Sequence, residues 1–206
     1  LHEKIIISRV ITENPSAGIV ARAKQSNIES VVIPFRPGAE RAAWERELSD
    51  AIAAIDPWLV VSAGFMKILS ADFVKRFQII NTHPSLLPLF PGAHAVRDAL
   101  AAGATESGCT LHFVDAGVDT GAIISQRKLV VAPNESEESL HERIKVLERE
   151  LVIFGILALL EEGEDRIGVL AVDVHLGGQR EGHTEVDPAE LLDRSIVAGL
   201  LVGELV

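Results

Sequence analysis

The strongest constraint in this sequence is a regular alternation of apolar, strand-like runs with amphipathic, helix-like segments. Residues 58–65, WLVVSAGF, form an unbroken apolar run, which is typical of a strand with both faces covered by helices. The segment before it, ERAAWERELSDAIAAI at 40–55, has helical spacing and ends at Asp56-Pro57. This alternation predicts an α/β fold, a doubly wound and mostly parallel sheet with helices on both faces.

The other apolar runs place the remaining elements. The run at 122–131 alternates apolar and polar residues, so we expect it near an edge of the sheet. Further strands are predicted at 4–11, 31–35, 78–83 and 109–115, with an edge strand at 166–174. Helices are also predicted at 15–28, 67–77, 95–103 and 134–163. We interpret residues 1–206 as a single domain, with residues 184–206 as an extra C-terminal helical tail.

Composition and charge exclude several classes of protein. Of the 206 residues, 48% are hydrophobic and 24% charged, as in an ordinary globular domain. The net charge of -11 argues against a nucleic-acid partner, because binding to phosphates depends on clustered Lys and Arg. No apolar run approaches the ~20 residues of a membrane span, and no secretory leader opens the chain. We expect a cytoplasmic protein with small-molecule partners, either monomer or homodimer, that binds no membrane.

The chain has a single cysteine, Cys109. One cysteine cannot form an intrachain disulfide or a multi-cysteine zinc site. It lies in the run GCTLHF, a predicted interior strand, where a free cysteine acts mostly as a small hydrophobic residue. The sequence therefore disfavours a reactive thiol at this position.

Polar residues at the ends of predicted strands are the candidates for chemistry. Asn81 and His83 end the strand QIINTH, and the period of two sends both side chains to the same face. Asp119 follows another strand, in the Gly-containing loop DAGVDTGA. Taken singly, each has a structural explanation: a hydrogen-bonded core histidine, a strand-end cap and a turn former. Together they predict a site at neighbouring carboxyl ends of the sheet, where open α/β sheets bind ligands.

The three residues suit direct group transfer between two bound substrates. Asn81 would donate an amide N–H to a developing oxyanion, His83 would polarise or carry a proton, and Asp119 would hold the imidazolium. Ser85 follows a proline in a loop and has no paired base, so acyl-enzyme chemistry is weakly supported. A metal site built from His83, His94, His112 and Asp119 lacks the paired spacing of known zinc motifs, so we expect no metal.

Several motifs resemble the formyltransferase family that uses 10-formyltetrahydrofolate. They are Asn-X-His-Pro-Ser-Leu-Leu-Pro from Asn81, Phe-Pro-Gly and His at 90–94, Val-Asp-Thr-Gly at 118–121, VVSAGFMKIL at 60–69 and SEESLHERIKVLERE at 136–150. The resemblance covers roughly residues 4–183 and implies the same doubly wound fold. It also implies formyl transfer from 10-formyltetrahydrofolate to the primary amine of glycinamide ribonucleotide, without a metal.

The resemblance also implies roles for individual residues. The family's catalytic Asn, His and Asp fall on Asn81, His83 and Asp119. The implied folate-binding residues are Arg41, Met66, Lys67, Ile68, Leu69, Asn81, Asp115, Ala116, Gly117, Val118 and Asp119. Lys145 and Glu148 match the positions that contact the glycinamide substrate. LGGQR at 176–180 is similar to the family's tail.

Two departures from the family pattern change what we expect. The family opens with a strand and a Gly-Ser-rich loop that binds the substrate phosphate at a helix N-terminus, and this sequence opens at the family's second strand. We expect that the segment is missing from the given sequence; the alternatives are a form without phosphate binding, or a permuted one in which 166–182 supplies the strand and the Gly loop. Lys67 stands where an arginine is more usual, and the connection RFQIINTH is slightly short.

Three other functions are open from the sequence. A formyltetrahydrofolate deformylase shares the same Asn, His and Asp, although Phe90-Pro91-Gly92 and His94 favour the transferase. A methionyl-tRNA formyltransferase would carry a further domain and a basic face, which the charge of -11 disfavours. A folate-binding protein without catalytic activity is the third.

Overall fold

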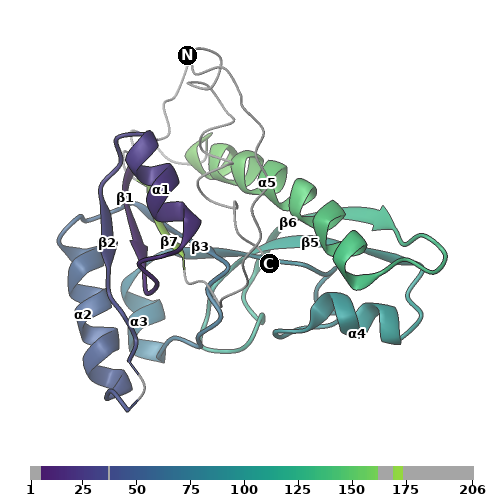
Figure 1. Ribbon diagram of the computed structural model, residues 1–206, viewed down its shortest axis with the longest axis horizontal. Helices are drawn as coiled ribbons and strands as arrows, with labels where there is room; N and C mark the ends of the chain where they lie inside the picture. Colours follow the sequence, from purple (N-terminus) through teal and green to yellow (C-terminus); the bar gives the residue numbers. More distant parts are fainter. Residues whose placement is uncertain (1–5, 37, 162–168, 174–206) are drawn as a thin grey trace.

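The structure is a computed structural model that describes residues 6–36, 38–161 and 169–173. Within these residues, seven strands form one central sheet in the order β2-β1-β7-β3-β4-β5-β6 (Figure 1). The strands are β1 (Ile7–Thr12), β2 (Ser30–Val32), β3 (Leu59–Ala63), β4 (Ile79–His83), β5 (Glu106–Phe113), β6 (Ile123–Val130) and β7 (Val169–Asp173). The helices are α1 (Gly18–Gln25), α2 (Arg41–Ala53), α3 (Ala71–Arg76), α4 (Ala95–Ala101) and α5 (Glu137–Glu161).

The pairing of the strands confirms the predicted fold class. The pairs β1/β2, β1/β7, β3/β7 and β3/β4 are parallel, and the pairs β4/β5 and β5/β6 are antiparallel. Strand β6 lies at one edge of the sheet, as its alternating sequence predicts. The sheet is therefore mostly parallel, with an antiparallel extension that contains β5 and β6.

The strand predicted at 166–174 is found at a different place in the sheet. The prediction of an edge strand is wrong, because β7 lies at the centre and pairs in parallel with both β1 and β3. Its sequence VLAVD is almost entirely apolar, which is typical of a strand covered on both faces. The loop and helix of the permuted alternative, the motif LGGQR and the tail at 184–206 lie outside the described residues.

Two hydrophobic clusters cover the two faces of the sheet. Val10, Val61 and Ile80 belong to a cluster with residues of α1, α4 and α5. Ile11, Val60 and Ile79 belong to a second cluster with α2 and α3. Neighbours along each strand thus point to opposite layers, as the period of two requires. Figure 1 shows α2 and α3 near the β2 end of the sheet and α5 running over β5 and β6.

This alternation determines which way the polar end of β4 points. Asn81 and His83 share the face of Ile79, whereas Thr82 shares the face of Ile80, which α5 covers. The two predicted catalytic side chains therefore leave β4 together, and Thr82 points toward α5.

One predicted helix starts later in the structure than the sequence suggests. The helix predicted at 67–77 begins only at Ala71, where the Ser70 hydroxyl accepts a hydrogen bond from the Phe73 N–H, and residues 64–70 form a loop.

Cys109 is fully buried in β5, as the sequence predicts, and burial raises the pKa of its thiol to about 12. Such a thiol stays protonated and is not a nucleophile.

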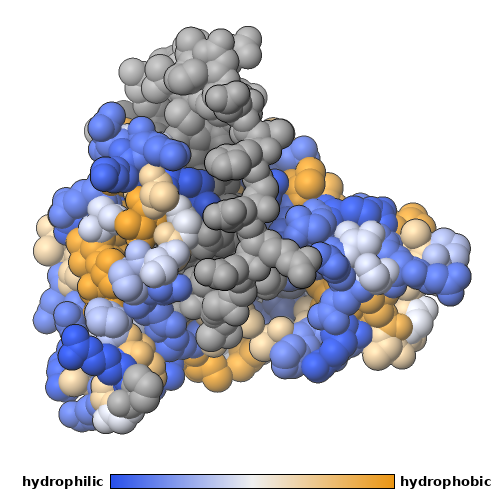
Figure 2. Space-filling view, viewed as in Figure 1, coloured by the Kyte–Doolittle hydropathy of each residue, from blue (hydrophilic) through white to orange (hydrophobic). Residues whose placement is uncertain are grey.

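The outer surface is mainly polar on the face shown in Figure 2, where hydrophilic residues cover most of the coloured area and apolar residues form smaller patches. Among the helices in the described part of the chain, none is long and apolar enough to cross a membrane.

Candidate functional site

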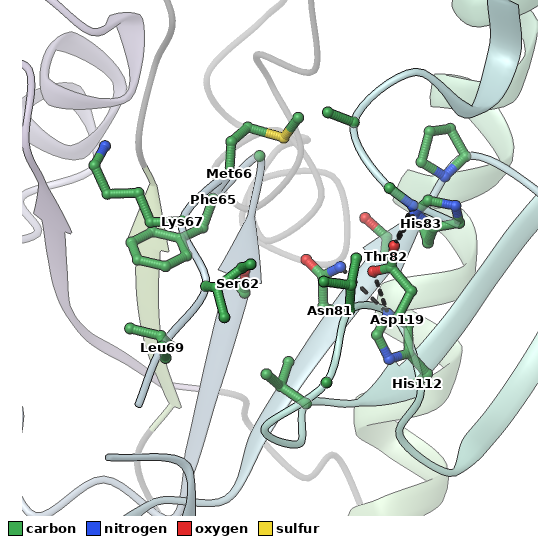
Figure 3. A pocket seen from close by; sticks show the side chains of 18 of the residues that line it. Ser62, Phe65, Met66, Lys67, Leu69, Asn81, Thr82, His83, His112 and Asp119 are labelled. Atoms are coloured by element: carbon green, nitrogen blue, oxygen red, sulfur yellow. Dashed lines mark hydrogen bonds and ion pairs between the residues drawn. The ribbon is translucent and has the colours of Figure 1, made fainter. Parts of the chain in front are cut away.

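A cavity of about 200 Å³ lies where β3 and β4 end and the β5–β6 loop begins. One wall comes from residues 64–69 after β3, and the opposite wall comes from Asn81 to Pro84 and from the β5–β6 loop (Figure 3). His141 of α5 also lines it. The cavity thus occupies the place at which doubly wound sheets bind their ligands.

Asn81, His83 and Asp119 converge in this cavity, as the sequence predicts. Nδ1 of His83 lies 3.3 Å from Oδ2 of Asp119. Asn81 is the second residue before His83, and its side chain lies on the same wall (Figure 3). All three line the cavity, and both His83 and Asp119 are largely shielded from solvent, with exposed side-chain fractions of 5% and 14%.

The hydrogen bonds of His83 define where its protons lie. Nε2 is 2.8 Å from the carbonyl oxygen of Phe90, which can only accept, so Nε2 carries a proton. Nδ1 faces the Asp119 carboxylate, and this contact is an ion pair when Nδ1 is protonated too. The ring is therefore fixed at both nitrogens, with Asp119 as the partner of its cationic form.

Asp119 is held by the backbone of two loops. The amide of Gly92 donates a hydrogen bond of 2.7 Å to its Oδ2, and the residue itself has a φ of +54°. Nearby, a Cβ atom on Gly121 would lie 1.7 Å from the carbonyl oxygen of Phe113, so only glycine fits at this position. The β5–β6 loop therefore folds back tightly against the end of β5, and this brings Asp119 to His83.

The reason for Asp119 being at the site differs from the one that the sequence suggests. The prediction places it at the carboxyl end of a strand parallel to β4, but β5 is antiparallel to β4, with Ile80 opposite Phe113 and His83 opposite Thr110. The end of β5 is thus level with Ile80. The returning loop, and not the strand direction, brings the carboxylate to the site.

His112 is a cavity residue that the sequence reasoning considered only as a metal ligand. Its Nδ1 donates to the Phe113 carbonyl oxygen at 2.8 Å, which leaves Nε2 as an acceptor 3.3 Å from Nδ2 of Asn81. Burial lowers its pKa below the usual value of 6.5, so the ring is neutral near pH 7. Its place follows from the strand register, which sets His112 directly opposite Asn81, and this pairing of distant segments is not visible in the sequence.

The wall formed by residues 66–69 combines apolar side chains with backbone groups. Met66 and Ile68 line the cavity with 49% and 59% of their surface exposed, and Val118 faces the same space with 45% exposed. Large apolar side chains that are exposed together in a cavity are typical of a binding site. Arg41 does not line the cavity; its guanidinium donates to the carbonyl oxygen of Ile68 and holds this wall from outside.

The segment from Asp115 to Asp119 is partly in the cavity. Asp115, Gly117, Val118 and Asp119 line it, and Ala116 does not. Oδ1 of Asp115 accepts hydrogen bonds from the Gly117 amide at 3.0 Å and from the Thr120 hydroxyl at 2.7 Å. Asp115 therefore shapes the turn that carries Asp119.

Lys145 and Glu148 do not line the cavity. The ammonium of Lys145 pairs with Glu142 at 2.7 Å. Glu148 is fully buried beneath Thr82, and neither carboxyl oxygen has a well-aligned hydrogen bond among the described residues. Burial raises the pKa of this carboxyl from 4.5 to about 8, and the nearby Thr82 hydroxyl, Lys145 and Arg149 offset only part of the effect.

The alternative chemistries weighed from the sequence find little support in the geometry. Ser85 is fully buried, and its hydroxyl donates to the carbonyl oxygen of Leu89 at 2.5 Å. His94 is exposed at the start of α4 and does not line the cavity. No group of three or more His, Cys, Asp or Glu residues in residues 6–36, 38–161 and 169–173 is arranged to hold a metal ion.

Fold and cavity together define a doubly wound α/β enzyme. The two nucleophiles weighed from the sequence, Ser85 and Cys109, do not line the cavity. Three of the residues that do line it, Asn81, His83 and Asp119, supply an amide, an imidazole and a carboxylate. This set suits direct transfer of a group between two bound molecules.

Comparison with known proteins identifies the family. A family model described as formyl transferase matches residues 2–156. A phosphoribosylglycinamide formyltransferase of Mycobacterium tuberculosis (strain CDC 1551 / Oshkosh) is 45% identical over 148 residues, which cover 71% of this chain and 69% of that protein. The crystal structure of a phosphoribosylglycinamide formyltransferase from Bacillus halodurans is 32% identical with a TM-score of 0.73, covering 77% of this chain and 83% of that one. The chain belongs to the formyl transferase family.

A trifunctional protein contains a similar region. The trifunctional purine biosynthetic protein adenosine-3 of Drosophila melanogaster is 44% identical over 146 residues, which are 70% of this chain and 11% of that protein. The matched region is thus found both in proteins of about this size and as one part of a much longer chain.

The buried carboxyl of Glu148 predicts a specific dependence of stability on pH. A carboxyl with a raised folded-state pKa stabilises the fold fully below pH 4.5, and this contribution is lost as the pH rises through about 8. Glu148→Gln keeps the shape and does not titrate. In urea denaturation at a series of pH values, the unfolding free energy of the wild type should fall relative to that of the variant, by on the order of a few kcal/mol. Parallel pH profiles for the two proteins would contradict the assignment.

Proposed function

We propose that this protein transfers the formyl group of 10-formyltetrahydrofolate to the primary amine of glycinamide ribonucleotide, a step of purine biosynthesis. The observation that carries the proposal is the convergence of Asn81, His83 and Asp119 in a cavity whose other wall is apolar. The relatives named as phosphoribosylglycinamide formyltransferases support the choice of acceptor. We assign the activity to one domain that contains the seven-stranded sheet.

We assign the apolar wall of the cavity to the folate. The flat ring of the donor would lie between Met66 to Leu69 on one side and Asp115 to Asp119 on the other. The exposed side chains of Met66, Ile68 and Val118 support this assignment, because an aromatic ring would cover them. Arg41 acts on this site through the Ile68 carbonyl.

We assign the side of the cavity near α5 to the ribonucleotide. His141 lines the cavity from the first turns of this helix, and Lys145 and Glu148 follow it at helical spacings of four and three. Glu148 is fully buried beneath Thr82, so its contact with a substrate would require the carboxyl to become accessible on binding.

In the reaction, the amine nitrogen of the acceptor attacks the formyl carbon, and a C–N bond forms while an electron pair moves to the formyl oxygen. Asn81 stabilises this oxyanion with its second amide N–H, because His112 accepts the first. The amine then loses a proton, and the bond from the formyl carbon to N10 of the folate breaks as that nitrogen gains one. We assign this proton transfer to Asp119, directly or through one water.

The two histidines have different roles in this scheme. His83 faces Asp119 through Nδ1 and the Phe90 carbonyl through Nε2, and in its cationic form the ring would place positive charge beside the oxyanion. His112 stays neutral and fixes the orientation of the Asn81 amide.

We place the reaction in the cytoplasm, without nucleic-acid or membrane partners and in a monomer or homodimer. This sequence has one cysteine, the buried Cys109, and so no intrachain disulfide to maintain, which suits a reducing compartment.

The dependence of the reaction on the acceptor tests the proposal. Purified protein is mixed with 10-formyltetrahydrofolate, with and without glycinamide ribonucleotide, and the loss of the donor is followed by absorbance. We expect donor loss only when the acceptor is present, with formylated ribonucleotide as the product. Formate release that is independent of the acceptor would instead show a deformylase, and folate binding without turnover would show a non-catalytic form.

Removal of the oxyanion donor gives a second prediction. Asn81→Leu keeps the side-chain size and should lower kcat by about 10²–10³, with a much smaller change in KM for the donor. The matched control is Gln78→Leu, which removes an exposed amide just before β4 and should leave kcat unchanged. An active Asn81→Leu enzyme would exclude the proposed role.

A further inference from the structure

Lys67 forms an ion pair inside the wall that residues 64–70 build. Its ammonium lies 2.5 Å from each carboxylate oxygen of Glu13, a residue that directly follows β1. Only 17% of the Lys67 side chain and 13% of the Glu13 side chain are exposed. Both charged groups are thus mostly removed from water, where a pair is weakly screened and strongly directional.

Aromatic rings complete the surroundings of the Lys67 ammonium. It lies 5.6 Å from the ring centre of Phe35 and 5.9 Å from that of Trp44, within the range of a cation–π contact. Trp44 stacks on Phe65 at 6.4 Å with an interplanar angle of 9°, and its indole N–H donates to the carbonyl oxygen of Ile33. One cation therefore contacts groups from the ends of β1 and β2 and from α2.

The direction of Lys67 explains why its two neighbours face the cavity. Residues 66–68 all line the cavity, but Met66 and Ile68 are 49% and 59% exposed, whereas the charged end of Lys67 is turned toward Glu13 and only 17% of its side chain is exposed. Figure 3 shows the Lys67 side chain pointing away from the wall that carries Asn81 and His83. Because Met66 and Ile68 flank Lys67 in the chain, holding the Lys67 ammonium against Glu13 keeps these two side chains on the cavity side.

The loop depends on side chains because it has little regular structure of its own. Residues 64–70 form neither helix nor strand. Besides the Lys67–Glu13 pair, the loop is held by the Arg41 guanidinium at the Ile68 carbonyl and by Glu45, which accepts from the Ser70 amide at 2.7 Å. Both of these bonds come from α2 and reach the loop after Lys67. The ion pair is the bond that ties the loop to β1.

We propose that Lys67 and Glu13 act together as a positioning pair that presents Met66 and Ile68 to the formyl donor, and that the Lys67 ammonium does not itself contact that donor. The identity of the donor rests on the proposed function. The loop that carries Lys67 forms the wall opposite Asn81, His83 and Asp119. The pair therefore affects the binding of only one of the two substrates, the formyl donor.

The kinetic test compares Lys67→Met, Glu13→Gln, their double variant and Lys67→Arg in the full chain. Each single neutralising variant should raise KM for 10-formyltetrahydrofolate about tenfold, with kcat and KM for the ribonucleotide changed by less than about twofold. The double variant should be no worse than Lys67→Met, because the pair acts as a unit. Lys67→Arg should have a KM for the donor close to that of the wild type, since a guanidinium also pairs with a carboxylate.

The exposed pair Lys128–Glu106 provides a matched control. Its atoms are 2.9 Å apart, with 58% and 50% of the side chains exposed, and neither residue lines the cavity. Lys128→Met and Glu106→Gln should leave all three kinetic constants unchanged. If these controls raise the donor KM as much as Lys67→Met does, or if the Lys67 variants raise both KM values equally, the proposed positioning role is wrong.

Amide hydrogen exchange without substrate separates this inference from the proposed function. Exchange of the Ser70 amide, which donates to Glu45 at the end of this loop, should become faster in Lys67→Met and in Glu13→Gln and stay as in the wild type in Lys67→Arg. This result would support the positioning pair even if the wild type transferred no formyl group, in which case only the proposed function would fail. Unchanged exchange in Glu13→Gln, the milder substitution, would overturn the pair.

Discussion

The contact between the Asp119 carboxylate and the His83 imidazole is the interaction on which the rest of the site depends. Oδ2 of Asp119 lies 3.3 Å from Nδ1 of His83 and accepts the Gly92 amide at 2.7 Å. One carboxylate oxygen therefore joins the end of β4, the loop after it and the β5–β6 loop. Because His83 is also bound to the Phe90 carbonyl, a shift of any one of these segments disturbs the others. The site is a closed network and not a set of independent side chains.

One side of the site is built on a strand and the other on loops. Asn81 and His83 leave β4, whose Ile79 and Ile80 are buried in the two layers of the core, so their positions follow from strand geometry. Asp119 and residues 64–70 lie on loops, and polar contacts hold them in place. Two of the three residues with chemical roles thus lie on a strand, whereas Asp119 and the wall assigned to the ligand lie on loops, which often carry functional residues in α/β enzymes.

Much of this arrangement could be predicted from the sequence, and the exceptions have physical causes. The doubly wound sheet, the shared face of Asn81 and His83 and the buried Cys109 follow from hydrophobic periodicity, which depends only on local geometry. The apolar sequence of β7 is compatible with a central strand, but it does not tell which strands β7 pairs with, so its place between β1 and β3 could not be read from periodicity. The antiparallel direction of β5 and the Asn81–His112 contact also depend on pairing between distant segments. The substrate roles of Lys145 and Glu148 stay a prediction from family resemblance.

The measurement that tests the account most directly is a double-mutant cycle on His83 and Asp119. The value of kcat/KM is determined for the wild type, His83→Asn, Asp119→Asn and the double variant in acceptor-dependent formyl transfer. If the two residues act as one ion-paired unit, each single variant should lose most of the activity and the double variant should be about as slow as the slower single one. Additive losses, with the double variant slower by the product of the two single effects, would contradict the account, because they would mean that His83 and Asp119 act independently.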